Sequence, residues 1–396
     1  MNIFEFILSD KRKKKIIRIV IIAFFLLNNY LNQNPLNYFV KLNYINECNK
    51  IEDYLKLCNN ELIKLKKIKK YKNPKISIIS PIYNRGRYIK RFIKSIQNQN
   101  FKEIEIILID DCSRDNSKLL IKKYIQEDNR IILIENKNNK GTFASRNIGI
   151  LKSIGQFIML PDPDDILEQS CLKYFYNLAK KNDYELIRFY IYRGKGIIYF
   201  GEHINKLPSK PIYQPELSTY IFYATKSNFQ IDFNVANKFI KREALIRALN
   251  YISKYIFIYM NRFEDGILNY FLYKVSKSFF FAKKISYYYI INRDSITTKK
   301  LSPVDLKCIF FHLKFVFEYS KNTKYDKNMS NNLLRRIGIK RKIKVRVLKI
   351  KNNFEFYLDI INEFLKNEFI NNNNKNYLMK TKQNILKAQK KRNNQD

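Results

Sequence analysis

The chain has 396 residues, which is enough for one large domain or two modest ones. Its net charge of +40 comes from basic residues spread along the whole chain without a nucleic-acid-binding motif, which argues against nucleic acid as a partner. Five widely spaced cysteines exclude a zinc-finger pattern and a dense disulfide framework, although one bridge such as Cys48–Cys58 stays open. With only two histidines, histidine-based triads are also disfavoured, and chemistry on carboxylates is expected.

The N-terminus combines a basic block at residues 11–15 with an apolar run at 16–27 that only Arg18 interrupts. A membrane-spanning helix needs about 20 apolar residues, so this run is short. It is typical of a secretory signal, but residues 28–31 lack the small side chains of a cleavage site. We therefore expect an uncleaved signal anchor at 1–30, which would attach the protein to the membrane with a single pass and a lumenal domain in the secretory pathway, followed by a stem at 31–72. A buried or amphipathic helix and attachment at the cytosolic face are the alternatives.

From residue 73 onwards, β-type and helix-type patterns alternate. The expected strands are 76–79, 104–109, 131–134 and 157–160, and the expected helices are 87–97, one capped by Asp115 and one capped by Thr142. Such alternation predicts right-handed βαβ units in a mostly parallel sheet covered by helices on both faces. We expect this α/β domain to extend over residues 73–302.

Acidic side chains follow two of the predicted strands. Asp110 and Asp111 come after the second strand, and Asp162, Asp164 and Asp165 come after the fourth. The carboxyl ends of parallel strands meet at one edge of a sheet, so both clusters are expected to lie there. Three crowded carboxylates repel one another unless a cation lies among them, and Mg²⁺ or Mn²⁺ prefers carboxylates together with phosphate oxygens. The sequence therefore predicts a divalent-metal site, with a solvated acidic turn as the alternative.

Four segments occur in a fixed order over about the first hundred residues of this domain. They are 76–84 (ISIISPIYN), 109–115 (IDDCSRD), 139–149 (NKGTFASRNIG) and 155–165 (GQFIMLPDPDD). The ordered set resembles the signature segments of family 2 glycosyltransferases. The resemblance implies a GT-A fold, with a Rossmann-like nucleotide-binding half followed by an acceptor half. It also implies a nucleotide-sugar donor, most often a UDP-sugar.

The resemblance assigns roles to the first two segments. Pro81 and Tyr83 would line the nucleotide pocket, and Asp111, preceded by Asp110, would accept a hydrogen bond from the base. Lys140 in the third segment would contact the diphosphate, or would simply be a solvated charge on a helix face.

The remaining assignments concern the diphosphate and the metal. Arg146 would also bind the diphosphate, while Asp162 and Asp164 would form the D-x-D element that contacts the ribose and a Mn²⁺ or Mg²⁺ ion. Asp165 would either assist the metal or have a structural role. Pro161 and Pro163 restrict the backbone around Asp162, which suits a preformed site.

Beyond the D-x-D element the pattern is sparser. Residues 186–192 alternate like an edge strand, and 237–243 resembles a family segment in which Lys238 would approach the donor phosphates or pack internally. Glu264 and Asp265 begin an apolar helical pattern, where the helix dipole stabilises a carboxylate. By resemblance, Asp265 would be the base that deprotonates the acceptor, with Glu264 as its positioning neighbour. An N-capping pair is the alternative.

The end of the chain is basic. We expect helices over 303–370 and a disordered tail at 371–396. Without any Trp, the chain lacks the Q-x-x-R-W element of processive synthases. The resulting hypothesis is an inverting, metal-dependent transfer of a single sugar to a hydroxyl of a glycan or glycoconjugate. A lipid-linked, polyprenyl-phosphate acceptor, an inactive binding homologue and a basic membrane-surface scaffold are the alternatives. The donor sugar and the linkage are not encoded in any motif.

Overall fold

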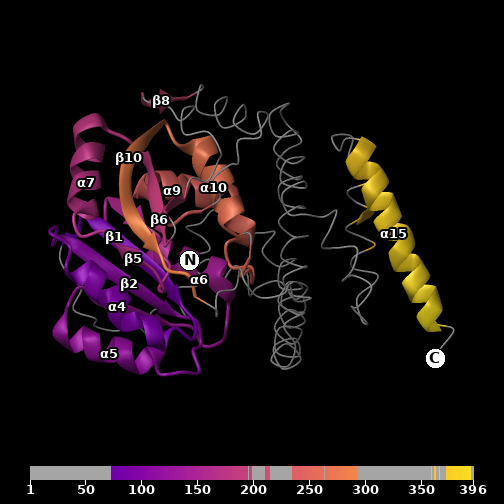
Figure 1. The fold of residues 1–396 in the computed structure, drawn as a ribbon, viewed down its shortest axis with the longest axis horizontal. Helices are drawn as coiled ribbons and strands as arrows, with labels where there is room; N and C mark the ends of the chain where they lie inside the picture. The colour runs from indigo at the N-terminus through magenta and orange to yellow at the C-terminus, as the bar shows by residue number, and fades with distance from the viewer. Residues whose placement is uncertain are drawn as a thin grey trace, which may run out of the picture.

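The computed structural model describes residues 73–194, 196–198, 210–214, 234–262, 264–292 and 372–393, with isolated positions at 358, 361–362 and 365 (Figure 1). The predicted anchor at 1–30 and stem at 31–72 lie outside the described residues, as does almost all of the basic region at 303–370. Among the helices in the described ranges, none has the length and apolar character needed to cross a bilayer.

Four parallel strands form one half of the sheet. β1 (Ile76–Ile82) lies between β2 (Ile104–Asp110) and β4 (Phe157–Met159), and β3 (Ile131–Glu135) pairs with the outer side of β2. Their residues are almost entirely buried, as expected for strands covered on both faces. All four expected strands are therefore present, and β1 continues through Pro81 to Ile82 rather than ending at the proline.

The other half of the sheet is mixed. β9 (Lys238–Lys241) runs antiparallel to both β4 and β6 (Leu186–Arg193), and β6 pairs in parallel with β10 (Ser278–Tyr289). Short strands complete it: β5 (Ile166–Leu167) and β8 (Ile212–Tyr213) pair with β10, and β7 (Gly196–Ile198) pairs with β6. The path of the sheet is β3-β2-β1-β4-β9-β6-β10-β5. The prediction of a mostly parallel α/β sheet is confirmed.

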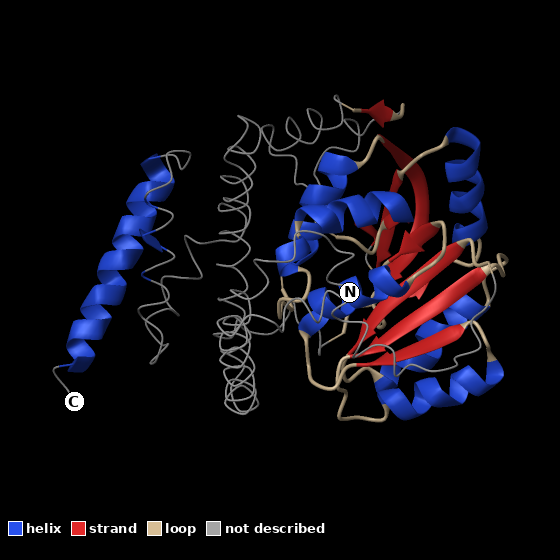
Figure 2. Ribbon diagram, turned by 180° about the vertical axis from the view of Figure 1, so that it is seen from behind, coloured by secondary structure: helices blue, strands red, loops and turns tan. Residues whose placement is uncertain are grey.

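Helices cover both faces of this sheet (Figures 1 and 2). One layer contains α4 (Gly86–Gln97), α5 (Ser117–Glu127) and α7 (Cys171–Asn182). The opposite layer contains α6 (Gly141–Lys152), α9 (Arg242–Tyr251) and α10 (Glu264–Val275), with a 3₁₀ turn at Ser253–Tyr255 after α9. We refer to these as the α4 layer and the α6 layer. Each layer buries an apolar stripe in its own hydrophobic cluster.

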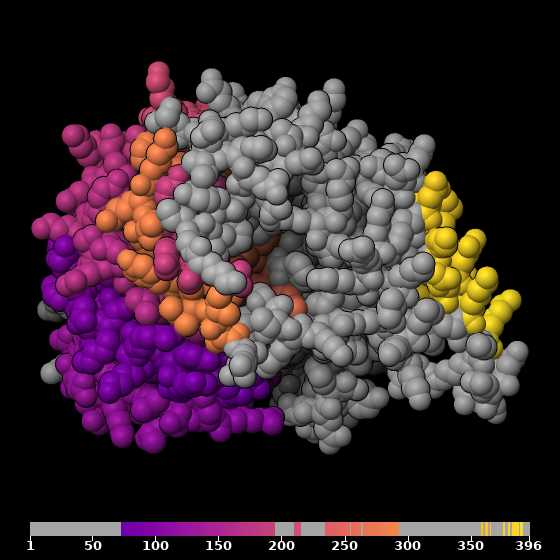
Figure 3. All heavy atoms as spheres, viewed as in Figure 1, coloured from indigo at the N-terminus to yellow at the C-terminus, as the bar shows by residue number. Residues whose placement is uncertain are grey.

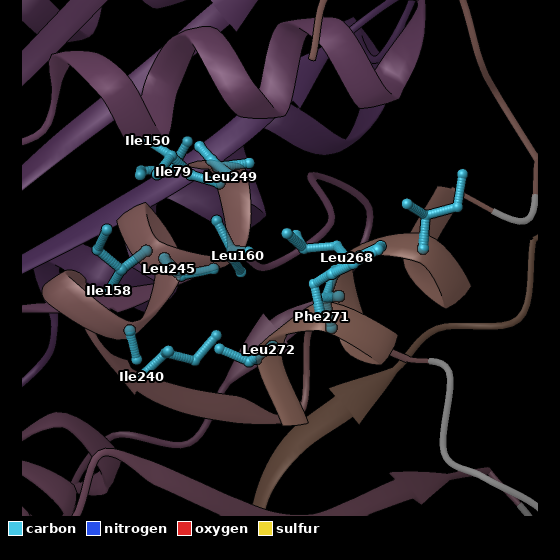
Figure 4. Packing of buried hydrophobic residues seen from close by; sticks show 14 of the residues in the cluster. Ile79, Ile150, Ile158, Leu160, Ile240, Leu245, Leu249, Leu268, Phe271 and Leu272 are labelled. Carbon is cyan, nitrogen blue, oxygen red and sulfur yellow. The ribbon is translucent and has the colours of Figure 1, made fainter. Parts of the chain in front are cut away.

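The cluster under the α6 layer joins the two halves of the sheet (Figure 4). It contains Ile158 of β4, Leu245 and Leu249 of α9, and Leu268 and Phe271 of α10. Because α10 packs in this cluster, the position of its first residues relative to β4 is fixed by a shared core rather than by a loop.

The expectation of an edge strand was wrong. Residues 186–193 are not an edge strand, because β6 has β9 on one side and β10 on the other. Its alternating pattern reflects a strand with one half-open face, which a central strand can also have. The tail predicted to be disordered from residue 371 contains the helix α15 (Asn372–Asn393), whose sequence is polar but has neither Pro nor Gly to interrupt it.

Candidate active site

The first acidic pair lies where β2 ends, and Asp111 is almost fully buried there. Its carboxylate accepts hydrogen bonds from the backbone N–H groups of Lys140 (2.7 Å) and Gly141 (2.8 Å) and from the side chain of Asn136 (2.8 Å). Asp111 therefore caps α6, a role that the sequence had suggested for Thr142. Since a carboxylate offers about four acceptor positions, one on Asp111 has no partner among the residues that the structure describes. Asp110 accepts a bond from the N–H of Ser113 through one oxygen, and its other oxygen is buried without a protein partner among the described residues.

The N-terminus of α6 also contacts the segment that precedes α10. Asn261 accepts a hydrogen bond from the N–H of Thr142 (2.8 Å), and the carbonyl of Met260 accepts one from Phe143 (2.9 Å). Gly141 has a φ of +83°, and a Cβ there would lie 2.8 Å from the backbone nitrogen of Met260. This close approach requires glycine. The first N–H groups of α6, which have no acceptor within the helix, thus donate to acceptors elsewhere in the protein.

The loops after β1 and β2 hold each other in place. The N–H of Asn84 donates to the Ser113 hydroxyl (3.1 Å), and the N–H of Arg114 donates to the Asn84 side chain (2.8 Å). Asn84 and Cys112 both have left-handed backbone angles, which few residues other than glycine adopt. Tyr83 beside them is 41% exposed, whereas Pro81 is buried within β1. At the predicted base pocket, the loops after β1 and β2 are therefore held together by hydrogen bonds, and Tyr83 is exposed beside them.

Arg146 connects the two halves of the site. It projects from α6 and is 2% exposed, and its guanidinium donates to Asp265 (2.7 Å) and to Asp162 (3.2 Å). Glu264 lies 3.6 Å from the same guanidinium nitrogen that binds Asp265. Burial alone would lower the pKa of Arg146, but Asp265, Asp162 and Glu264 raise it. One cation thus joins the end of β4 to the start of α10.

The three carboxylates after β4 have different surroundings. Asp162 keeps 39% of its side chain exposed beside Arg146. Asp164 accepts a hydrogen bond from Asn292 (2.6 Å) and lies 3.8 Å from Arg85.

Asp165 is buried, and both of its oxygens are occupied. They accept bonds from the Tyr287 hydroxyl (2.7 Å) and from the N–H of Ile290 (2.8 Å). The Tyr287 hydroxyl in turn accepts a bond from the N–H of Asp162 (3.0 Å). Asp165 therefore links the end of β10 to the D-x-D loop through hydrogen bonds.

Burial and mutual repulsion raise the pKa values of acidic side chains at this site. Burial, together with the neighbouring Asp162 and Asp164, raises the pKa of Asp165 to about 8. Burial also raises the pKa of Asp162 while Arg146 opposes the rise, and solvent at its exposed side chain moderates the shift. A ligand-free site with this many carboxylates is electrostatically unfavourable around neutral pH.

Glu264 and Asp265 form a second acidic pair, in the first turn of α10. Burial, followed by the adjacent Asp265, raises the pKa of Glu264 to about 8. Asp265 has the guanidinium of Arg146 and the N-terminus of α10 beside it, and both favour a negative charge nearby. The second oxygen of Asp265 is 3.5 Å from the N–H of Val235 and is only weakly engaged by that group.

The structure brings most of the predicted site residues to one edge of the sheet, but not in every predicted arrangement. The guanidinium of Arg146, which was expected to bind the diphosphate, donates hydrogen bonds to two carboxylates. Lys140 donates a hydrogen bond from its backbone N–H to Asp111. Lys238 is fully buried, and its ammonium group donates to Asn234 and Asn237, which corresponds to the packing alternative.

Four side chains make contacts to the D-x-D loop that were not expected from sequence: those of Arg85, Arg91, Tyr287 and Asn292. Arg85 directly follows the first signature segment, whereas Tyr287 lies in none of the four segments. Asn292 carries no signal of its own in the sequence.

The donor set partly fits a divalent metal. Within the described ranges, no group of three or more Asp, Glu, His or Cys side chains is arranged to hold a metal ion alone. Asp162, with its exposed carboxylate, and Asp164 supply hard oxygen ligands, and a metal that binds with a diphosphate needs only one or two carboxylates. Asp165 does not fit, because its oxygens already accept bonds from β10 and its neighbour.

Comparison with known proteins identifies relatives over the same region. The family model described as glycosyl transferase family 2 matches residues 77–247. The chain is 30% identical over 211 residues to an uncharacterized glycosyltransferase of Methanocaldococcus jannaschii, covering 51% of this chain and 70% of that protein. It is 27% identical over 169 residues to the glycosyltransferase GlyG of Streptococcus pneumoniae, covering 43% of this chain and 50% of GlyG.

A solved structure has the same fold. Residues 1–349 of TarS from S. aureus, in a complex with UDP-GlcNAc, superpose with a TM-score of 0.56 at 15% identity, covering 81% of this chain and 92% of that one. The chain spans about half of the length of GlyG.

Proposed function

This chain belongs to glycosyltransferase family 2, and on that premise we propose that it transfers a single sugar from a UDP-sugar to a hydroxyl acceptor, with inversion and with a bound Mn²⁺ or Mg²⁺. The acceptor is a hydroxyl of a glycan or glycoconjugate. The proposal extends to the division of the chain, with the catalytic domain at residues 73–302.

The observation that carries this proposal is the shared guanidinium of Arg146. It lies 3.2 Å from Asp162 of the D-x-D element and 2.7 Å from Asp265 at the start of α10. A donor-side carboxylate and a candidate base are therefore bound by the two terminal nitrogens of one guanidinium, although 103 positions of sequence separate them. In an inverting transfer, the acceptor hydroxyl attacks the anomeric carbon while the diphosphate leaves, so both groups are needed within one sugar's reach.

On the donor side, Asp162 and Asp164 would hold the metal, which would supply positive charge for the departing diphosphate. The loop pair after β1 and β2 would receive the base, with Tyr83 exposed beside it and one acceptor position of Asp111 without a partner among the described residues. Arg146 would be a positioning residue in this scheme, holding Asp162 and Asp265 in register.

On the acceptor side, Asp265 would take the proton of the attacking hydroxyl. Arg146 binds one of its oxygens, and the other is weakly engaged, so that a proton acceptor remains available. Glu264, uncharged at neutral pH, would avoid a second negative charge beside the base.

A thermal-shift experiment on the full chain tests the donor assignment. UDP, GDP and UDP-sugars would be added with and without Mn²⁺, because a ligand that binds only the folded state raises its stability. We expect UDP to raise the melting temperature more with Mn²⁺ than without it, and Asp162→Asn to remove the manganese-dependent part. A response to GDP alone, or an equal manganese response in Asp162→Asn, would contradict the assignment.

A further inference from the structure

The two helix layers differ in exposed charge. On α4, the solvent-facing positions Arg87, Lys90, Arg91 and Lys94 are all basic and exposed, and the helix contains no acidic residue. They follow one another at helical spacing opposite the buried stripe, so the whole outer face of α4 is cationic.

The neighbouring helices of the α4 layer extend this surface. Lys122 and Lys123 on α5 and Lys173, Lys180 and Lys181 on α7 are also exposed, and Glu127 is the sole acidic residue within these three helices. In the α6 layer, by contrast, none of the basic side chains is exposed. The charge of the described domain is therefore concentrated on one side and does not simply follow its overall composition.

Few of these cations are neutralised within the protein. Lys122 forms an ion pair with Glu135 (3.1 Å), and Arg91 donates to the backbone carbonyl of Asp164 (2.8 Å). Within the described ranges, Lys90, Lys123 and the three lysines of α7 have no ion pair. A clustered surface of unneutralised cations repels itself unless an anionic partner covers it.

Apolar and aromatic side chains lie among the charges. Leu119 on α5 is 60% exposed and Tyr174 on α7 is 41% exposed, while the ring of Tyr88 lies between Arg87 (6.0 Å) and Arg91 (5.7 Å). Exposed leucine and tyrosine beside lysine is the composition of surfaces that rest on lipid headgroups. In Figure 3 the residues of α4 and α5, in indigo and purple, occupy the lower left of the molecular surface.

We propose that the outer surface of the α4 layer binds an anionic phospholipid bilayer. Charge complementarity favours such a partner, and cations spread over three helices with intervening apolar side chains match a broad headgroup surface better than a single polymer strand. Because Arg91 contacts Asp164, this surface continues to the edge of the sheet that carries the active site. Bound in this way, the enzyme would present that edge next to the membrane. The inference does not depend on the sugar that is transferred.

The test uses the full chain in co-sedimentation with vesicles of phosphatidylcholine, with and without phosphatidylglycerol, at low and high ionic strength. We expect binding only with phosphatidylglycerol, weakening as salt screens the charges. Replacing five cations by glutamine (Arg87, Lys90, Lys123, Lys173 and Lys180) should lower the partition coefficient about fivefold per charge, which is about 3,000-fold in total.

The matched control removes five charges from α15 by changing Lys375, Lys380, Lys382, Lys387 and Lys390 to glutamine. Its partition coefficient should stay within a few-fold of the unmodified chain, and both variants should keep the same melting temperature. Equal losses in the two variants would overturn the proposal in favour of diffuse net charge. Absence of binding to phosphatidylglycerol vesicles would also overturn it, as would binding of soluble polyphosphate, but not vesicles, through the same five residues.

Discussion

The candidate active site has two acidic corners, one at the end of β2 and one at the end of β4, and different kinds of contact hold them. At the end of β2, Asp111 is satisfied by local backbone donors of Lys140 and Gly141 and by Asn136. At the end of β4, the carboxylates are held by side chains from distant segments, among them Arg146 and Tyr287. The first corner is a stable part of the fold, whereas the second collects more negative charge than its arginines neutralise.

The two corners are therefore expected to contribute differently to the stability of the ligand-free protein. A carboxylate that accepts three hydrogen bonds at a helix N-terminus stabilises the protein before any ligand binds. A carboxylate cluster with pKa values raised by burial destabilises the ligand-free protein, and binding of a cation relieves that cost. We therefore expect the loss of a carboxylate to cost more stability at the end of β2 than at the end of β4.

The largest effect is expected at Arg146, which holds the β4 corner together. Arg146→Met leaves Asp162 and Asp265 without their buried cation, and the free energy of unfolding should fall by about 3–5 kcal/mol. Arg146→Lys keeps the charge but cannot bind two carboxylates through a planar fork, so its loss should be smaller while sugar transfer is still impaired. Urea denaturation of both variants measures this, and a loss below 1 kcal/mol in Arg146→Met would show that the carboxylates do not depend on it.

A paired substitution compares the two corners directly. In Asp111→Asn, an amide NH₂ faces the N–H of Gly141 or Lys140 and leaves a buried donor unpaired, which should cost about 1–3 kcal/mol. In Asp162→Asn, a repelling charge is removed from a half-exposed position, so the ligand-free protein should change by no more than about 1 kcal/mol. Thermal unfolding without ligand distinguishes them, and an equal loss in both variants would contradict the comparison.

The pH dependence of stability gives a smaller effect. The pKa values of Asp165 and Glu264 are about 8 in the folded protein, above their unfolded values, so the folded state holds these protons more tightly. The free energy of unfolding should therefore fall as the pH rises from about 4 to about 8. Glu264→Gln should reduce this slope, giving about 1 kcal/mol of relative stabilisation near pH 8 and none near pH 5. An unchanged slope in Glu264→Gln would show that this glutamate is charged in the folded protein.

The position of the two acidic clusters could be predicted well from sequence because they directly follow strands. A parallel strand order places residues 110–111 and 162–165 at one edge whatever the loops do, and the structure has that order. Asp265 lies near them through packing of α10 in a shared core, which no local pattern states, and only the resemblance pointed to it.

The sequence did not predict which groups the individual side chains and strands would contact. The resemblance assigned Arg146 to the diphosphate. No spacing rule indicated that the first turn of α10 would place two acidic side chains beside it. The capping role of Asp111 was missed for the same reason, because its acceptor geometry depends on how α6 meets the end of β2. Burial of β6 between two strands likewise depends on β9 and β10, which come later in the chain.

The most direct test of the account is a paired measurement on Asp265→Asn with the same UDP-sugar. The affinity for the donor would be measured by calorimetry, and the release of UDP in the presence of acceptor would be followed over time. The account predicts an affinity within a few-fold of the unmodified chain and a turnover lower by a factor of ~10² or more. Unchanged turnover would remove Asp265 as the base and, with it, the claim that Arg146 joins the donor and acceptor sides of one catalytic centre.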